Sequence, residues 1–243
     1  MITIIFQMSS LSRLTFLGLP VTTWLPPSGL VSRVVVFLHG SGDTGGGVAD
    51  WVGSLVTREE VGTNTAVLFP SAKLRPYTLS GQNKASVWHD REELSMEGRE
   101  DTEGIKNMGQ NVEQLLSEVE QCGVVRSGIA LGGFSQGGHL ALHAVFAQGV
   151  EVGAAFSVSA FLCDKTAVFS QSEVGRDVTP PLFMSCGGLD QMVPHTWVEN
   201  TRDRLEQRGV KVTFSTRPGI GHELERKQMK QLFEWLGNNL KTH

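Results

Sequence analysis

Residues 129–147 constrain the fold more than any other part of the chain. The apolar run 129–131 predicts a buried strand, the glycine-rich segment 132–138 a sharp turn, and the apolar run 139–147 a long helix. A strand that passes through a tight turn into a helix is the repeating unit of an α/β protein with a mostly parallel sheet. We therefore expect the chain to be built from such units.

The turn carries one serine, Ser135, in the pattern Gly-Phe-Ser-Gln-Gly, which fits the G-x-S-x-G motif of a nucleophile elbow. A serine at the apex of so tight a turn adopts strained dihedrals, and the residues two positions away on either side must lack side chains. The turn also places Ser135 at a helix N-terminus, where free backbone N–H groups can hold a developing oxyanion. The alternative interpretation is an ordinary glycine-rich turn with a surface serine.

Composition bounds the fold class and the partners. The 243 residues suit one large α/β domain over 1–243, and with 40% hydrophobic and 19% charged residues the chain can bury a real core. A net charge of −4 gives no electrostatic reason to expect a nucleic acid partner or an anionic membrane. Three widely spaced cysteines form neither a disulfide framework nor a zinc pattern, and they suit a reducing compartment.

The N-terminus shows no targeting signal. Residues 2–6 are apolar, but no basic residue precedes them, so a secretory signal peptide is not expected. No run approaches ~18 apolar residues, so neither a transmembrane helix nor integral membrane association is expected. Residues 1–13 are interpreted as a poorly ordered N-terminal extension, with Met8 as an alternative start. The expected location is cytoplasmic.

Short β-branched runs alternate with amphipathic stretches, which predicts a mostly parallel central sheet with helices on both faces. The predicted strands are 34–38, 65–69, 129–134, 154–159, 181–186 and 210–215, with a further edge strand near 14–17. Apolar positions at helical spacing predict helices over 108–119 and 229–240. Segments 70–90 and 91–103 break the alternation, and loops of this length are usually functional or disordered.

A serine hydroxyl becomes a nucleophile only when an oriented base takes its proton. In this architecture the chain order is Ser, then Asp or Glu, then His. The histidines that could follow an acid are His195, His222 and His243, of which His243 is the last residue and would fray. His222 lies in a glycine-rich loop between the last strand and the last helix, so it is preferred to His195 as the base.

Asp190 is the preferred acid because it follows the predicted strand 181–186, at the carboxyl end where catalytic groups of open parallel sheets gather. Asp164 follows the strand 154–159 in the same manner and is the runner-up. For either residue the alternative is a solvated aspartate in a turn.

Strand 34–38 leads into a second glycine-rich loop. We expect the backbone N–H groups of Ser41, in this loop, and of Gln136, after the nucleophile, to be the oxyanion donors; the alternative is a plain turn. Residues 40–45 also match the G-x-G-x-x-G dinucleotide motif. However, the next strand, 65–69, ends in Pro-Ser instead of the acid that would bind a ribose, so that reading fails.

His139 and His143 lie four residues apart on the helix after the elbow and share one face. Zinc hydrolases of the H-E-x-x-H type need a glutamate directly after the first histidine, and here that residue is Leu140. The two are interpreted as packed, hydrogen-bonded core histidines, and no metal is implied.

The chain resembles a known family in four motifs taken together. These are Leu-His-Gly-Ser-Gly-Asp at 38–43, the elbow at 132–138, Asp190 before Val-Pro, and Gly-His at 221–222. It is similar to the acyl-protein thioesterase/lysophospholipase (phospholipase/carboxylesterase) family of α/β-hydrolases. The match runs from about residue 34 to 236. The residues at 41–43 and 222–224 look most like the lysophospholipase-like branch of that family.

The resemblance implies a serine hydrolase of carboxylic esters or thioesters with no cofactor and no metal. It implies Ser135 as nucleophile, Asp190 as orienting acid and His222 as general base, with Ser41 and Gln136 as backbone oxyanion donors. The substrates implied are a small acyl ester or thioester or an S-acylated protein, and the expected state is a monomer or weak homodimer.

The same resemblance places Trp88, in Trp-His-Asp, beside the binding groove, and Phe161 and Leu162 on the acyl site. Two departures concern the substrate: Ser41 stands where the thioesterases usually have Leu, and loop 73–87 does not follow their acyl-binding loop. Shorter acyl chains are therefore expected. The alternatives are a long-chain protein depalmitoylase or lysophospholipase, and, in another class, a non-catalytic ligand-binding protein on the same fold.

Overall fold

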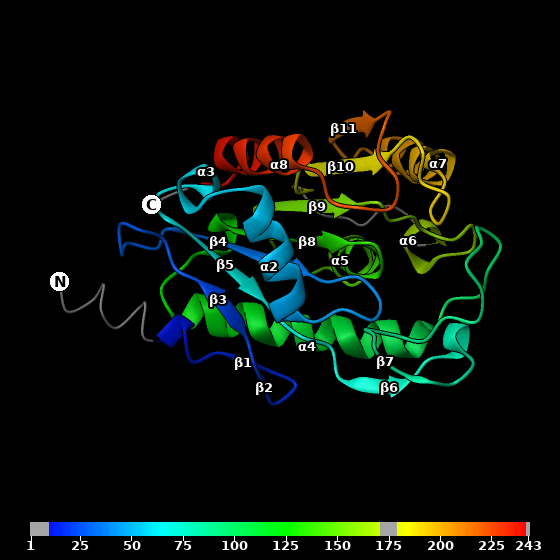
Figure 1. Cartoon of the computed structure of the whole chain (residues 1–243), viewed down its shortest axis with the longest axis horizontal. Helices are drawn as coiled ribbons and strands as arrows, with labels where there is room; N and C mark the ends of the chain where they lie inside the picture. Colours follow the sequence, from blue (N-terminus) through cyan, green and yellow to red (C-terminus); the bar gives the residue numbers. More distant parts are fainter. Residues whose placement is uncertain (1–9, 171–178, 242–243) are drawn as a thin grey trace.

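The computed structural model describes residues 10–170 and 179–241. Seven strands form the central sheet, and in spatial order they are β11 (Val212–Arg217), β10 (Leu182–Gly187), β9 (Ala154–Val158), β8 (Ile129–Phe134), β4 (Arg33–Leu38), β5 (Thr65–Phe69) and β3 (Thr22–Trp24). Each neighbouring pair is parallel except β3 with β5, which is antiparallel (Figure 1). The predicted strands are confirmed to within two residues at each end, apart from the one near 14–17.

Helices cover both faces of the sheet, as predicted. One face carries α4 (Thr102–Gln121), α5 (Gln136–Phe146), α6 (Ala167–Ser170) and α7 (His195–Glu206). The other carries α2 (Gly45–Leu55), α3 (Arg58–Val61) and α8 (Arg226–Asn239). Figure 1 shows the long α4 beneath the sheet and α8 on the opposite side.

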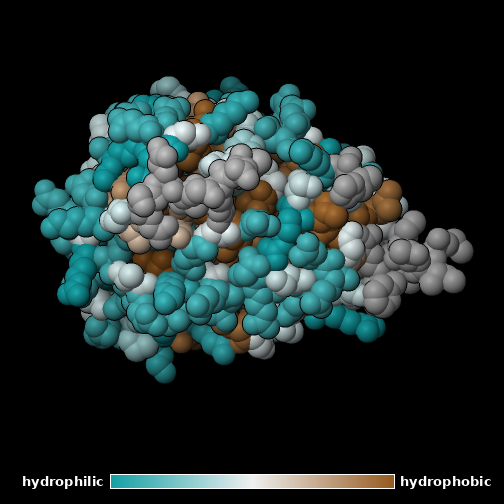
Figure 2. Space-filling model, turned by 180° about the vertical axis from the view of Figure 1, so that it is seen from behind, coloured by the Kyte–Doolittle hydropathy of each residue, from teal (hydrophilic) through white to brown (hydrophobic). Residues whose placement is uncertain are grey.

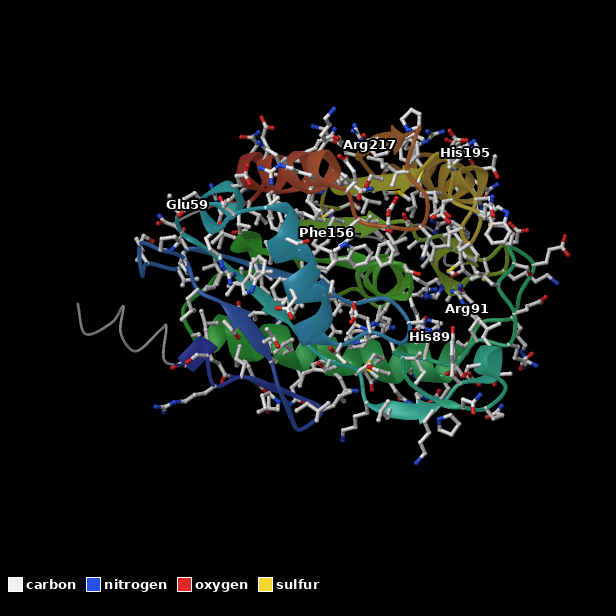
Figure 3. The ribbon with its side chains drawn as sticks, viewed as in Figure 1. Glu59, His89, Arg91, Phe156, His195 and Arg217 are labelled. Carbon is white, nitrogen blue, oxygen red and sulfur yellow. The ribbon has the colours of Figure 1, made fainter. Side chains whose placement is uncertain are left out.

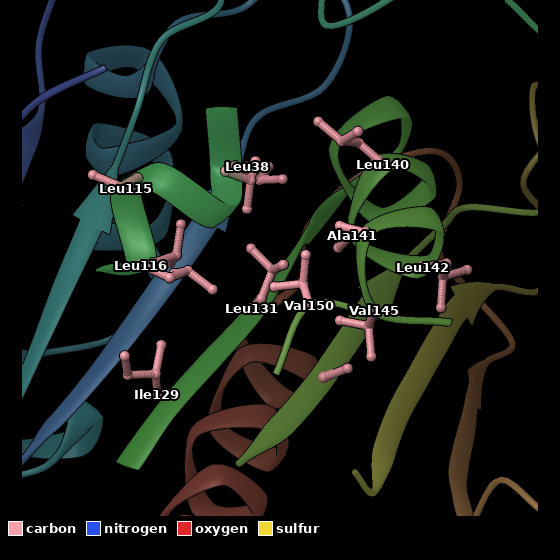
Figure 4. Close-up of a cluster of buried hydrophobic side chains, with 14 of the residues drawn as sticks. Leu38, Leu115, Leu116, Ile129, Leu131, Leu140, Ala141, Leu142, Val145 and Val150 are labelled. Atoms are coloured by element: carbon pink, nitrogen blue, oxygen red, sulfur yellow. The ribbon is translucent and has the colours of Figure 1, made fainter. Parts of the chain in front are cut away.

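The alternation of side chains along β4 explains why the core has two halves. Val34, Val36 and Leu38 pack toward α4 and α5, whereas Val35 and Phe37 pack toward α2 and α8. A strand that is buried on both faces reads as one continuous apolar run, which is the pattern seen here. Figure 4 shows the first half of the core, where leucines of α4, β4 and β8 meet those of α5.

The prediction that residues near 14–17 form an edge strand of the central sheet was wrong. β1 (Thr15–Phe16) pairs with β2 (Leu19–Pro20) in a separate ribbon, because Leu17 and Gly18 reverse the chain with positive φ of 54° and 78°. The sheet ends instead at β3, where the ring of Trp24 packs 4.8 Å from that of Phe69. Within the segment expected to be an extension, Leu11 is fully buried in the core, while residues 1–9 lie outside the described residues.

The segment between β5 and α4 carries a small hairpin, β6 (Leu74–Pro76) with β7 (Lys84–Ser86), and a 3-10 turn, η1 (Thr78–Ser80). A second 3-10 turn, η2 (Arg126–Gly128), precedes β8. Hydrophilic side chains dominate the face of the molecule seen in Figure 2. Among the described helices, none has the length and apolar character needed to cross a membrane.

Candidate active site

The turn between β8 and α5 gives Ser135 a conformation that few residues adopt. Its φ of 53° and ψ of −120° lie in a strained region for a residue with a side chain. A Cβ on Gly133 or on Gly137 would overlap the carbonyl oxygen of Leu38, so neither position admits a side chain. The chain therefore turns sharply enough to raise the Ser135 hydroxyl above the end of the sheet.

The loop after β11 brings His222 to this serine. Its Nε2 lies 3.0 Å from Oγ of Ser135, and its ring packs 4.8 Å from the ring of Phe134. His195, the other candidate base, is the first residue of α7 (Figure 3), and within the described residues Ser135 has its histidine contact with His222. His243 lies outside the described residues.

The loop after β10 places Asp190 behind the histidine. Oδ2 of Asp190 lies 2.7 Å from Nδ1 of His222, and Oδ1 accepts hydrogen bonds from the N–H groups of Met192 and Val193 at 2.9 and 2.8 Å. A carboxylate can only accept, so Nδ1 of His222 keeps its proton and donates a hydrogen bond to Asp190, which leaves Nε2 as an acceptor for the serine hydroxyl. The runner-up acid, Asp164, instead forms an ion pair with Arg204 at 3.1 Å.

The residues expected to supply the oxyanion donors, Ser41 and Gln136, line one cavity together with Ser135. Ser41 follows β4, Gln136 opens α5, and within the described residues neither N–H group has a hydrogen-bond acceptor. The Gln136 side chain is held in place, because its Oε1 accepts from the N–H of Trp88 at 2.9 Å and its Nε2 donates to the carbonyl of His89 at 3.0 Å. This pair of free donors can bind an oxyanion.

A cavity of about 460 Å³ opens beside Ser135. Its wall combines apolar and polar side chains, among them Leu79, Leu94, Phe161, Met192, Val193, Ser41, Tyr77 and Arg91. The Ser41 and Tyr77 hydroxyls lie 3.4 Å apart, and the Arg91 guanidinium carbon lies 5.1 Å from the centre of the Phe161 ring.

Of the three residues expected to bind substrate, Phe161 lines this cavity, and its ring also packs 4.8 Å from that of Trp197. Leu162 is fully buried, and its N–H donates to Thr201. Trp88 is fully buried as well: its indole N–H donates to the carbonyl of His39 at 2.7 Å, in the loop that carries Ser41. In the structure, Trp88 and Leu162 thus support the site from within the core.

A buried polar network next to the elbow escaped the sequence analysis. As expected, His139 and His143 are buried and hydrogen-bonded, but their shared partner is Glu100, with Oε1 3.1 Å from Nε2 of each. His89 adds a second contact, 3.1 Å from its Nε2 to Nδ1 of His139. Burial lowers the pKa of His139 to about 3. Glu100 belongs to a charge-dense segment in which no spacing singles it out.

The fold and the site match one family of known proteins. The sequence profile of the phospholipase/carboxylesterase family matches residues 25–240. The chain belongs to this family. As a phospholipase/carboxylesterase family member, it is an ester hydrolase of the carboxylesterase, thioesterase and lysophospholipase type.

Individual relatives of this family member agree with that assignment. Lysophospholipase-like protein 1 of Mus musculus is 33% identical over 210 residues, which cover 86% of this chain and 88% of the mouse protein. Acyl-protein thioesterase 1 homolog 1 of Dictyostelium discoideum is 28% identical over 211 residues, 86% of this chain and 91% of that protein. The crystal structure of Zea mays acyl-protein thioesterase 2 superposes with a TM-score of 0.77 at 25% identity, covering 91% of this chain and 99% of the other.

Proposed function

We propose that the chain is a serine hydrolase that cleaves carboxylic esters or thioesters through an acyl-enzyme intermediate. The observation that carries the proposal is the relay from Asp190 through His222 to Ser135, with contacts of 2.7 and 3.0 Å, beside two unpaired backbone donors. A ligand-binding protein on this fold would have no use for a strained serine at hydrogen-bond distance from an oriented base.

In the acylation step, the Ser135 proton moves to Nε2 of His222 while Oγ attacks the substrate carbonyl carbon. The negative charge that develops on the carbonyl oxygen is stabilised by the N–H groups of Ser41 and Gln136. The new Oγ–C bond remains, the C–O or C–S bond to the leaving group breaks, and the alcohol or thiol takes the proton from His222. Asp190 stabilises the imidazolium that forms in between.

Deacylation repeats the step with water as the nucleophile. Water gives a proton to Nε2 of His222, its oxygen attacks the acyl carbon, and Oγ of Ser135 leaves with that proton. The carboxylic acid departs and the enzyme returns to its starting state. Every group that these two steps require lies at the carboxyl end of a strand in the described structure.

We further propose that shorter acyl chains are favoured. The polar Ser41–Tyr77 contact forms part of the cavity wall. The Phe161 ring packs against Trp197 and lies near the Arg91 guanidinium. A long alkyl chain gains most where it contacts only apolar walls. Because several relatives are named thioesterases, thioesters, including those of S-acylated proteins, are the substrates to compare with small esters.

The His222→Ala variant should lose p-nitrophenyl acetate hydrolysis by about 10⁴-fold or more in kcat, because nothing else takes the serine proton. Its matched control is His195→Ala, which changes the other candidate histidine and should stay within about twofold of the unsubstituted enzyme. Steady-state kinetics of both variants decide the matter. Equal losses in the two variants would contradict the assignment of the base.

A series of p-nitrophenyl esters and acyl thioesters from acetyl to palmitoyl tests the chain-length proposal. We expect kcat/KM to be highest for the shortest acyl chains and to fall by about tenfold or more toward palmitoyl, because a longer chain extends beyond the apolar part of the cavity wall. A maximum at palmitoyl would instead identify a long-chain depalmitoylase or lysophospholipase.

A further inference from the structure

The buried polar network beside the elbow has the composition of a metal site. Glu100, His139 and His143 each offer one ligand atom, and these three atoms lie within 4.8 Å of one another. The two histidine side chains are only 1% and 3% exposed, and that of Glu100 is 9% exposed. His139 and His143 share one face of α5, and Glu100 approaches from the segment before α4.

The hydrogen bonds of the network place a proton or a metal ion between His139 and Glu100. Nδ1 of His89 lies 2.9 Å from the carbonyl oxygen of Asp90, so it carries the proton. Nε2 of His89 is then an acceptor, and it accepts a hydrogen bond from the N–H at Nδ1 of His139, 3.1 Å away. Neutral His139 therefore aims the lone pair of Nε2 at the carboxylate oxygen of Glu100, 3.1 Å away. Two such lone pairs repel each other unless a positive charge lies between them.

We propose that Glu100 Oε1, His139 Nε2 and His143 Nε2 bind a divalent transition metal ion, with zinc as the ion that suits them best. Imidazole and carboxylate ligands bind zinc at about 2.0–2.2 Å, so tetrahedral ligand atoms lie about 3.3–3.5 Å apart. The observed distances from Oε1 to the two nitrogens are both 3.1 Å, whereas the three ligand atoms together lie within 4.8 Å of one another, so the two imidazole rings must move toward each other to share one ion. Nε2 of His143 also lies 3.1 Å from Oγ1 of Thr166, a hydrogen bond that the ion would replace. The donor set is two nitrogens and one oxygen, with the fourth position left for water.

The surroundings fit this role. In the metal-bound state Nδ1 of His139 keeps its proton and donates a hydrogen bond to Nε2 of His89, and Nδ1 of His89 donates one to the carbonyl of Asp90. Outer partners of this kind fix the orientation of metal-binding histidines. On its other side, Glu100 lines a cavity of about 590 Å³ whose wall carries five acidic and three arginine side chains, which provides a route for a hydrated cation.

The ion would join two parts of the chain that are distant in sequence. Glu100 belongs to the segment that follows β7, whereas both histidines lie on α5, the helix that starts at Gln136. The contacts of His222 and Asp190 with Ser135 involve none of the three ligands. The expected role is therefore to stabilise the fold around the elbow, and it does not depend on the proposed hydrolytic mechanism.

The test uses the full chain, dialysed first against EDTA and then against metal-free buffer. Titration with Zn²⁺ should show one tight site by calorimetry, and saturating Zn²⁺ should raise Tm by about 5 °C or more. Co²⁺ in place of Zn²⁺ should give the visible absorption of a tetrahedral site. The metal response should persist in His222→Ala, since the triad histidine is not a ligand.

His143→Gln and Glu100→Gln should each abolish the rise in Tm, whereas the matched control His195→Gln should keep it. Circular dichroism establishes that the variants are folded, and Glu100→Gln carries the test if His143→Gln is not. The proposal fails if Zn²⁺ leaves the Tm of the unsubstituted protein unchanged, or raises that of the ligand variants equally. In the first case a proton shared between His139 and Glu100 takes the place of the metal ion.

Discussion

Ser135→Ala should lower kcat for p-nitrophenyl acetate by about 10⁴-fold or more, because the variant retains the oxyanion donors and the base but has no atom to acylate. The alanine fits the space of the serine. The two backbone hydrogen bonds of residue 135, from its N–H to the carbonyl of Val158 and from the N–H of His139 to its carbonyl, do not involve the hydroxyl. The variant should therefore remain folded. The measurement is steady-state hydrolysis, together with mass-spectrometric mapping of a fluorophosphonate label.

The label should map to Ser135 in the unsubstituted protein and disappear in the variant. Ser54→Ala is a suitable control, because this hydroxyl is exposed on α2 and donates only to the carbonyl of Trp51. It should leave both labelling and turnover unchanged. Substantial turnover by Ser135→Ala, or a label on another residue, would rule out the serine mechanism and leave the ligand-binding alternative open.

Gly137→Ala should be among the most destabilising substitutions in the chain, lowering the free energy of unfolding by about 3 kcal/mol or more. Alanine normally favours a helix over glycine. Here, however, the added Cβ would overlap the backbone of Leu38 and His39, which the sheet holds in place. Neither neighbour is a flexible side chain, so the strain cannot be relieved locally. Urea unfolding followed by circular dichroism measures the loss.

Gly237→Ala provides the matched comparison on α8, where a Cβ meets no atom within 4 Å. This substitution should stabilise the protein by about 0.5–1 kcal/mol, as expected for a helix interior. If the two Gly→Ala substitutions change the free energy of unfolding in opposite directions, the loss in Gly137→Ala comes from the packing of the elbow and not from helix propensity. If Gly137→Ala unfolds at the urea midpoint of Gly237→Ala, the tight packing of the elbow on β4 is not as described.

Local pattern was enough to predict much of this molecule from its sequence. The strand at 65–69 has the expected bounds. Chain order and the position of its glycine-rich loop favoured His222, whose Nε2 lies 3.0 Å from Oγ of Ser135 in the structure. The strands could be predicted because a buried strand reads as an uninterrupted apolar run, and the candidate site residues because catalytic loops follow strand ends. The roles of Ser135, His222 and Asp190 in catalysis stay predictions until the variants are measured.

The features that were missed depend on contacts between distant segments. Glu100 meets His139 across 39 positions, and its sequence neighbours are mostly charged, so no periodicity could mark it. Trp88 was placed beside the groove by resemblance, but its indole N–H is committed to the carbonyl of His39 beneath the site. The edge strand β3 has only three residues, too few for an alternating pattern to identify.

The pairing of β4 with β8 bears on the position of the two proposed oxyanion donors. Leu38 is directly opposite Gly133 in these neighbouring parallel strands. Ser41 lies three residues beyond the first and Gln136 three residues beyond the second, so the two donors leave the sheet from the same level. Neighbouring strands are separated by about 4.8 Å in any sheet. The register of β4 and β8 therefore makes the two loops that carry the proposed donors begin side by side, whatever sequences follow in those loops.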